Sequence, residues 1–414
     1  MTRYLRNWNI LITLSLLTSC ASDTSSPEHS FRIYEEDGVT IAETAGGPKF
    51  EGELFEYIEV VRLNQDDSVP ESLLGMPSPY FMDEEGSFYV PDLRPPRVVC
   101  FDAEGQYSHT IGREGEGPGE YRSVEITRIR GDELTVFDGR TRRATRFHTD
   151  GTLVSTLTTR YQKSGPAPAY SLNGLQGDEH GRMITYWSVR NREDIYQMSG
   201  AAVDVLDSEG EVLFEIETPM IRIMYEINSG GIVAGVGLSF SGSPVIWRLD
   251  DGRFIQTTGE APEIDVFSSE GDLTGRIVID LPLESTAQAE AELRAYYAER
   301  IRNATNPHSR SLSQAMLEDF QIPEYKAFWS DMEIDESGYI WLRHSEQFYG
   351  TVADSISWRV LSPDGEYLGE TRCQATEAGL SYGHLLTIHE NEETGAQDLI
   401  VYCIVPAVPG LRYP

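Results

Sequence analysis

Short apolar runs alternate along most of the chain with acidic turns that contain glycine. In the clearest copy, the runs 80–82, 87–92, 97–101 and 107–111 are separated by short polar breaks, and two of these breaks, 83–86 and 102–105, end in glycine. Because glycine adopts the positive φ angle that tight hairpin turns require, this pattern predicts four antiparallel strands joined by hairpins.

The same arrangement of strands and turns recurs four more times. The glycine of the second turn is found at positions 105, 151, 210, 271 and 365, so successive copies are 46, 59, 61 and 94 residues apart. A four-stranded unit of about 40–50 residues that repeats along the chain is typical of a β-propeller blade, and longer spacings need only loop extensions. We therefore expect an all-β fold, a six-bladed β-propeller over residues 31–414.

The sixth blade is expected to contain strands from both ends of the chain. Two strands, 384–389 and 398–405, flank a turn at 393–395, and no further pair follows them. Near the N-terminus, a hairpin over 31–43 and a strand over 55–63 precede the first blade. We expect these N-terminal strands to complete the last blade and close the ring, which removes exposed sheet edges.

One interval, about 284–322, has helical periodicity instead. Ser285 with Gln288, and Ser311 with Gln314, have the spacing of capping boxes, and Pro323 ends the pattern. We predict a helical hairpin inserted in the propeller. It is expected either to pack on one face of the ring or to cover one mouth of the central channel.

The N-terminus has the features of an export signal. Arg3 and Arg6 precede an apolar run, 10–17, that is too short to cross a bilayer, which takes about 20 residues. Residues 17–20, Leu-Thr-Ser-Cys, resemble the bacterial lipobox. The resemblance implies a signal peptide over 1–19, lipidation (palmitate) of Cys20 and a polar tether over 20–30. The alternative is an ordinary secretory signal.

The residue after the lipidated cysteine bears on the location of the protein. It is Ala21 and not the aspartate that retains such proteins in the inner membrane. The resemblance therefore implies a lipid-anchored protein of the cell envelope, held in the outer membrane with its body on the periplasmic or the surface face.

The charge and the cysteine content limit the classes of partner and the disulfides that the chain can have. The chain has 67 Asp and Glu against 33 Lys and Arg, a net charge of −34, which argues against a nucleic-acid partner. Besides Cys20 it has Cys100, Cys373 and Cys403. The export signal permits a disulfide, for which Cys373–Cys403 is the most plausible pair, and the alternative is buried free thiols.

The stretch 111–121, Ile-Gly-Arg-Glu-Gly-Glu-Gly-Pro-Gly-Glu-Tyr, resembles the connection between blades in six-bladed β-propellers related to NHL repeats. Segments 89–92 and 97–102 and the strand around Trp341 fit the same family, which is common among bacterial secreted lipoproteins. The resemblance implies the fold, and hardly constrains activity, because propellers serve as binding platforms and relatives include metal-dependent lactonases and lyases.

Local motifs for chemistry are weak. The glycines of 112–117 lack the lysine and the helix of a phosphate-binding loop, and Gly379–Gly383 matches G-x-S-x-G without the helix that this motif needs. The acidic turns lack a calcium-loop ligand series, and the histidines show no metal-binding spacing. We interpret these features as structural and predict no catalytic residue, metal ligand or cofactor.

Six residues are candidates for the lining of the central channel. Five are aromatic residues at blade entrances, which either form a binding surface at the mouth or pack between blades, and the sixth is a histidine at the start of a strand expected to be innermost, a candidate ligand or base. They are Tyr80, Tyr170, Tyr225, Trp329, Tyr382 and His384.

The sequence therefore predicts a membrane-anchored exported lipoprotein whose propeller binds an unidentified protein, glycan or small molecule. Two alternatives from other classes stay open. One is an axial-metal-dependent hydrolase or lyase of the lactonase-like propeller type, and the other is a structural subunit of an envelope complex.

Overall fold

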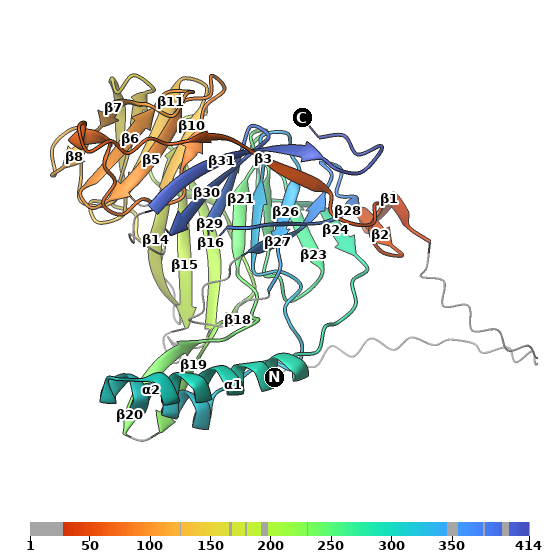
Figure 1. Ribbon diagram of the computed structural model, residues 1–414. Helices are drawn as coiled ribbons and strands as arrows, with labels where there is room; N and C mark the ends of the chain where they lie inside the picture. Colours follow the sequence, from red (N-terminus) through yellow and green to blue (C-terminus); the bar gives the residue numbers. More distant parts are fainter. Residues whose placement is uncertain are drawn as a thin grey trace, which may run out of the picture.

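The computed structural model describes residues 28–124, 126–164, 168–178, 180–191, 198–229, 231–345, 355–375, 377–390 and 397–413. Its sheets form the six blades of a β-propeller, as the sequence predicts (Figure 1). The predicted signal peptide, Cys20, most of the tether and the turn at 393–395 lie outside the described residues. In the described part of the chain, no helix has the length and apolar character needed to span a membrane.

The first three blades follow one another along the chain. Blade one consists of β4 (Phe81–Met82), β5 (Phe88–Leu93), β6 (Pro96–Phe101) and β7 (Tyr107–Ile111). Blade two consists of β10 (Ile126–Arg130), β11 (Glu133–Asp138), β12 (Arg143–His148) and β13 (Leu153–Thr158). Blade three consists of β14 (Pro168–Gly177), β15 (Met183–Asn191), β16 (Met198–Leu206), β17 (Val212–Glu217) and the short β18 (Ile221–Arg222), which pairs with β16.

The other three blades include all the strands from the chain ends. Blade four consists of β21 (Val245–Arg248), β22 (Phe254–Thr257), β23 (Glu263–Phe267) and β24 (Leu273–Ile279), followed by β2 (Val39–Ala45) and β1 (Ser30–Glu36). Blade five consists of β25 (Asp331–Ile334), β26 (Ile340–Arg343), β27 (Ile356–Leu361) and β28 (Tyr367–Cys373). Blade six consists of β29 (Glu377–Ser381), β30 (His384–Glu390), β31 (Gln397–Pro406) and β3 (Phe55–Arg62).

Smaller elements connect the blades. They are the turn η1 (Pro70–Ser72), the parallel pair β8 (Arg113–Glu114) and β9 (Glu120–Tyr121), the hairpin β19 (Met224–Ser229) and β20 (Ile232–Gly237), and the helices α1 (Ala287–Asn303) and α2 (Pro307–Asp319). The β8–β9 pair lies in the glycine-rich stretch between blades one and two, where a side chain at Gly112 would meet the ring of Tyr121 at 2.1 Å. This stretch is therefore a tight crossing between blades, as predicted.

The acidic turns are hairpin tips closed by their own aspartates. In blade one, Oδ1 of Asp83 accepts hydrogen bonds from the backbone N–H groups of Glu85 (3.0 Å) and Ser87 (2.9 Å), and Gly86 has a φ of 87°. Oδ1 of Asp335 accepts the same pair of bonds in blade five. The repeated Asp and Gly positions are thus explained by turn geometry.

The ring is closed by β3, which pairs antiparallel with β31. The earlier hairpin differs from our expectation, because β2 runs parallel to β24 and so extends blade four and not blade six. Between β2 and β3, the N–H groups of Lys49, Phe50 and Leu54 donate to carbonyls of β28 in blade five. The N-terminal segment therefore joins blades four, five and six in turn, because each of them presents an unpaired outer edge to it.

The core is divided into apolar clusters between adjacent blades. Between blades five and six, Trp341 and Trp358 are buried with Phe55 of β3, whose ring stacks on Trp341 at 5.2 Å between centroids. Similar clusters lie between blades four and five and between blades six and one. Burial of β3 side chains in such a cluster gives ring closure an apolar component besides its backbone hydrogen bonds.

The helical insertion is confirmed, with two corrections to its ends. Thr286, and not Ser285, occupies the N-cap of α1. Helix α2 begins at Pro307, four residues before Ser311, because Oδ1 of Asn306 accepts a hydrogen bond from the N–H of His308 (2.9 Å) and proline favours the first helical position.

Helix α2 packs against the β19–β20 hairpin, and α1 packs on α2. Buried Tyr225, Ile227 and Val236 of the hairpin contact Ala315 and its neighbours on α2. Figure 1 shows these four elements together, below the blades, and we call them the extension. The extension gives the insertion a small core of its own, beside the ring.

Among the described residues, Cys100, Cys373 and Cys403 are free thiols. Cys373 belongs to the apolar cluster between blades five and six, together with Ile404 of β31. Side chains alternate along a strand, so Cys403 faces the opposite side of blade six, where Val401 packs towards blade one. The two cysteines therefore lie on different faces of one blade, and the Cys373–Cys403 disulfide is not formed.

Candidate functional site

Three of the six predicted channel residues are buried in packing contacts. Tyr80 and Tyr225 are each 2% exposed and Trp329 is fully buried. The hydroxyl of Tyr80 donates to the carbonyl of Ile400 (3.0 Å), and Nε1 of Trp329 donates to Oγ1 of Thr257 (3.0 Å). Tyr225 lies on β19, in the core of the extension. These side chains hold neighbouring elements together and present little surface to a ligand.

Of the other three, Tyr170 lies apart from Tyr382 and His384. Tyr170 is on β14, and the centre of its ring lies 5.4 Å from Nζ of Lys163. Tyr382 occupies the turn after β29 with a φ of 44°, and Nδ1 of His384 donates to its carbonyl (2.8 Å). His384 begins β30, the second strand of blade six, because β29 takes the innermost position that we expected for it. Only Tyr382 and His384 are brought together.

The first strand of each blade lies nearest the central axis, where β4 contacts β10 and β29, and β25 contacts β29. On β25, Asp331 and Glu333 alternate with buried Met332. Nε1 of Trp247, on β21, donates to the carbonyl of Met332 (2.7 Å), and its indole ring is 42% exposed. The first strand of blade five therefore carries two acids, and Trp247 joins this strand to blade four.

The electrostatics of this central group favour a protonated acid. Burial raises the pKa of Glu333 to about 8, and the nearby Asp331 carboxylate raises it further, while Arg343 and the N–H of Leu380 act in the opposite direction. Burial also raises the pKa of Asp331. At neutral pH Glu333 is thus mainly a neutral hydrogen-bond donor, which is unusual for a carboxyl group.

One mouth of the channel is acidic. Oε2 of Glu336, in the turn after β25, accepts from the N–H of Tyr382 (2.7 Å) and thereby ties blades five and six together. Burial raises the pKa of Tyr382, and the nearby carboxylates of Glu336, Glu84 and Asp250 raise it further. Turns from blades one, four, five and six therefore converge there. In the described residues no three His, Cys, Asp or Glu side chains are grouped so as to hold a metal ion.

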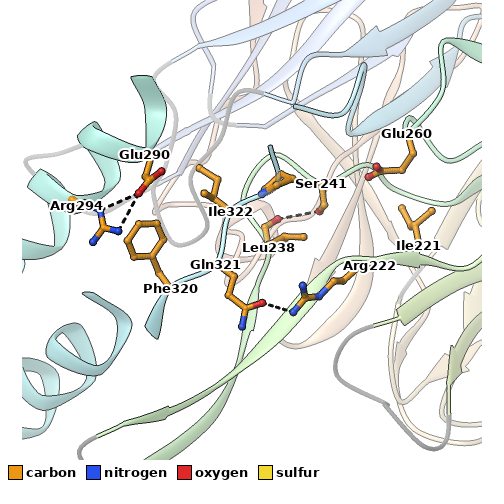
Figure 2. Close-up of a pocket in the computed structure, with 11 residues that line it drawn as sticks. Ile221, Arg222, Leu238, Ser241, Glu260, Glu290, Arg294, Phe320, Gln321 and Ile322 are labelled. Carbon is orange, nitrogen blue, oxygen red and sulfur yellow. Dashed lines mark hydrogen bonds and ion pairs between the residues drawn. The ribbon is translucent and has the colours of Figure 1, made fainter. Parts of the chain in front are cut away.

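A cavity lies where the extension meets the ring, and it is the strongest candidate site (Figure 2). Its volume is about 710 Å³, within the range of small-molecule sites. Its walls come from five segments, namely β18, residues 238–241 after β20, the turn at Glu260 in blade four, helix α1 and the strand-like segment 320–323 after α2. The site therefore exists only when the extension is folded onto the ring.

The cavity combines apolar walls with charged groups. The apolar residues are Ile221, Leu238, Phe320, Ile322 and Pro323. On α1, Arg294 donates from Nε and Nη2 to Oε1 of Glu290 (3.2 and 3.0 Å), and its guanidinium lies 4.4 Å from the centre of the Phe320 ring.

Across the cavity, Nη2 of Arg222 donates to Oε1 of Gln321. Oε1 of Glu260 accepts from the N–H of Gly242 (2.9 Å), which fixes that carboxylate at the rim. Apolar walls with a few fixed polar groups are typical of sites that bind organic molecules.

Sequence reasoning did not identify this cavity or the central acids. A local signal for the extension is present in the sequence, because the apolar runs on either side of Asn228, Ser229 and Gly231 form a hairpin pattern. No local signal connects Arg222 with Arg294, which are brought together only by packing of the extension.

Comparisons with known proteins agree with the fold. A family model described as a 6-bladed beta-propeller matches residues 47–163, which span β3 and blades one and two. No curated protein matches the chain.

Several solved structures are similar to the chain. A putative exported protein from Bacteroides fragilis is 11% identical, with 87% of this chain and 99% of that chain covered and a TM-score of 0.46. A member of the DUF4221 family from Bacteroides vulgatus is 12% identical, with 86% and 100% covered and a TM-score of 0.47. Virginiamycin B lyase from Staphylococcus aureus is 12% identical, with 86% and 90% covered and a TM-score of 0.34.

Proposed function

We propose that this six-bladed propeller is an exported, lipid-anchored binding protein that holds a small organic ligand between its extension and its ring. The observation that carries the binding function is the cavity of about 710 Å³, whose apolar walls surround fixed polar groups. The ring supplies a rigid frame, and the extension supplies the opposite wall, so a bound molecule contacts both.

The anchor rests on the N-terminal sequence. The positive residues, the short apolar run and Cys20 have the order of a lipoprotein signal. Ser30, where β1 begins, is ten positions after Cys20, and an extended segment of that length reaches roughly 35 Å. The tether would hold the outer edge of blade four near the bilayer surface.

Replacing Cys20 by alanine is expected to abolish lipid attachment, because the thiol is the acceptor of the lipid. Metabolic labelling with a palmitate analogue should mark the wild-type protein in the membrane fraction and leave Cys20→Ala unmarked in the soluble fraction. Cys100→Ala, which removes a buried thiol of blade one, is the matched control and should be labelled normally. Labelling of Cys20→Ala would overturn the proposed anchor.

The binding function is tested by filling the cavity. Full-length protein purified from membranes without denaturation should yield a small molecule on extraction and mass spectrometry, and Ile322→Trp should lose it because the indole occupies the site. Leu283→Trp changes an exposed leucine outside the cavity and is the matched control. Equal yields of every extracted compound from the two variants, with both folded, would contradict the proposal.

A further inference from the structure

Among the described residues, no carboxylate pairs with the positively charged side chain of Arg222. Its Nη2 donates to the neutral amide of Gln321. Its Nε is shielded from solvent and has no hydrogen-bond partner among the described residues. A buried donor without a partner costs about 1–3 kcal/mol, and more when it is charged, so this site is favourable for an incoming acceptor.

Three other arginines of the ring that are mostly shielded from solvent have carboxylate partners. Nε of Arg97 lies 3.2 Å from Asp92, Nε of Arg182 lies 2.6 Å from Asp178, and Nη2 of Arg359 lies 3.3 Å from Glu284. In a chain of net charge −34, carboxylates are abundant. The pairing of Arg222 with an amide is therefore not a consequence of a shortage of acids.

The second arginine of the cavity is different. Arg294 is neutralised by Glu290 and lies against the face of Phe320, where a cation is attracted to the ring. The Arg294 guanidinium therefore covers the Phe320 ring, and its charge stays paired with the Glu290 carboxylate. Of the two cavity arginines, Arg222 is thus the one without a carboxylate partner among the described residues, and Figure 2 shows its side chain well apart from that of Arg294.

The remaining groups limit the charge and the shape of the anion. The apolar wall of the cavity includes Ile221, Leu238 and Ile322. A fully hydrated ion would make no favourable contact with this wall. Glu260 and Glu290 line the same cavity, and their negative charges disfavour a ligand with several charges. The site therefore suits one acidic group joined to an apolar body.

We infer that the cavity binds an organic carboxylate with a single negative charge and a hydrocarbon or aromatic body, with its carboxylate on Arg222. This inference rests on the proposed function, since it names the class of ligand for the same site. A carboxylate accepts hydrogen bonds from Nε and Nη2 together in the bidentate arrangement that favours arginine. To do so it displaces the side-chain amide of Gln321.

The experiment compares three probes on the full-length protein in detergent by isothermal titration calorimetry. The probes are 3-phenylpropanoate, its neutral amide 3-phenylpropanamide, and inorganic phosphate. We expect 3-phenylpropanoate to bind more tightly than the other two. We also expect Arg222→Gln to lower its affinity roughly 10- to 100-fold, the usual value of a hydrogen bond to a charged group. Arg222→Lys should retain part of the affinity.

Arg294→Gln is the matched control within the cavity, and we expect it to reduce the affinity for 3-phenylpropanoate less than Arg222→Gln does. If the amide binds as tightly as the acid, or if Arg222→Gln binds the acid unchanged, the inferred ligand class is wrong while a binding cavity remains. If the small molecule extracted from the protein is absent from Ile322→Trp yet carries no acidic group, the ligand class is again overturned and the proposed function stands.

Discussion

Replacing Lys163 by methionine is expected to lower the free energy of unfolding by about 3–5 kcal/mol, the usual cost of removing one partner from a buried ion pair. The side chain of Lys163 is only 5% exposed, and its Nζ lies 2.7 Å from Oδ1 of the fully buried Asp204 and 2.8 Å from Oε2 of Glu215. Burial alone would lower the pKa of Lys163, but these carboxylates raise it above its usual value. Without the lysine, Asp204 would be left as an uncompensated charge within blade three.

Two further variants distinguish this explanation from a general effect of losing a lysine. Lys49→Met removes a half-exposed lysine paired with Glu366 and should cost less than about 1 kcal/mol. Asp204→Asn combined with Lys163→Met removes both charges and should recover much of the loss. Urea unfolding followed by circular dichroism measures all of them, and similar losses for Lys163→Met and Lys49→Met would contradict the account.

The second large effect is a loss of stability as pH rises, caused by Glu333. Its pKa is about 8 in the folded protein and near its usual value of 4.5 in the unfolded chain. Between these values the folded state holds a proton that the unfolded state has released, so its stabilisation is complete below pH 4.5 and disappears above pH 8. Within this window one such group contributes a slope of about −1.4 kcal/mol per pH unit.

Glu333→Gln keeps the hydrogen-bonding side chain and cannot ionise. Its free energy of unfolding should therefore fall less steeply than that of the wild-type protein between pH 5 and 8, and the variant should be the more stable of the two at pH 9. Glu85→Gln, at the exposed tip of a blade-one hairpin, is the matched control and should follow the wild-type curve. Parallel curves for Glu333→Gln and the wild-type protein would show that this carboxyl group is not the source.

The blades were predictable because their signals are local. Each hairpin tip is closed by contacts within a few residues, such as Asp83 with Glu85 and Ser87, and the strands alternate with a period of two. The pairing of β3 with blade six was predictable because the last repeat lacks strands and β3 immediately precedes the first blade. A prediction of this kind needs only the chain order and the repeat.

The remainder depends on contacts between distant segments. The strand β29 was missed because Glu377–Ser381 has little apolar alternation, and this displaced His384 to the second strand. The β1–β2 hairpin could join any free outer edge, and its parallel pairing with β24 is decided by packing. The cavity joins Arg222 to Arg294 across a long stretch of chain, so no local pattern marks it.

The cavity depends on closure of the ring by β3, because the blades and the extension hold its walls in place only in a closed ring. Ile58 of β3 lies directly opposite Cys403 of β31, and directly opposed residues of antiparallel strands have Cα atoms about 4.5–5.5 Å apart, within reach of a disulfide. Glu56 lies opposite Val405, two positions further along β31. The diagonal distance between Glu56 and Cys403 is therefore too long for a disulfide.

The direct measurement is peptide mapping of oxidised, full-length Ile58→Cys by mass spectrometry, with Glu56→Cys as the control. The account predicts an intramolecular disulfide between positions 58 and 403 in the first variant and none between 56 and 403 in the second. Free thiols at both 58 and 403 in the folded, oxidised protein, or a link at 56 instead, would contradict it.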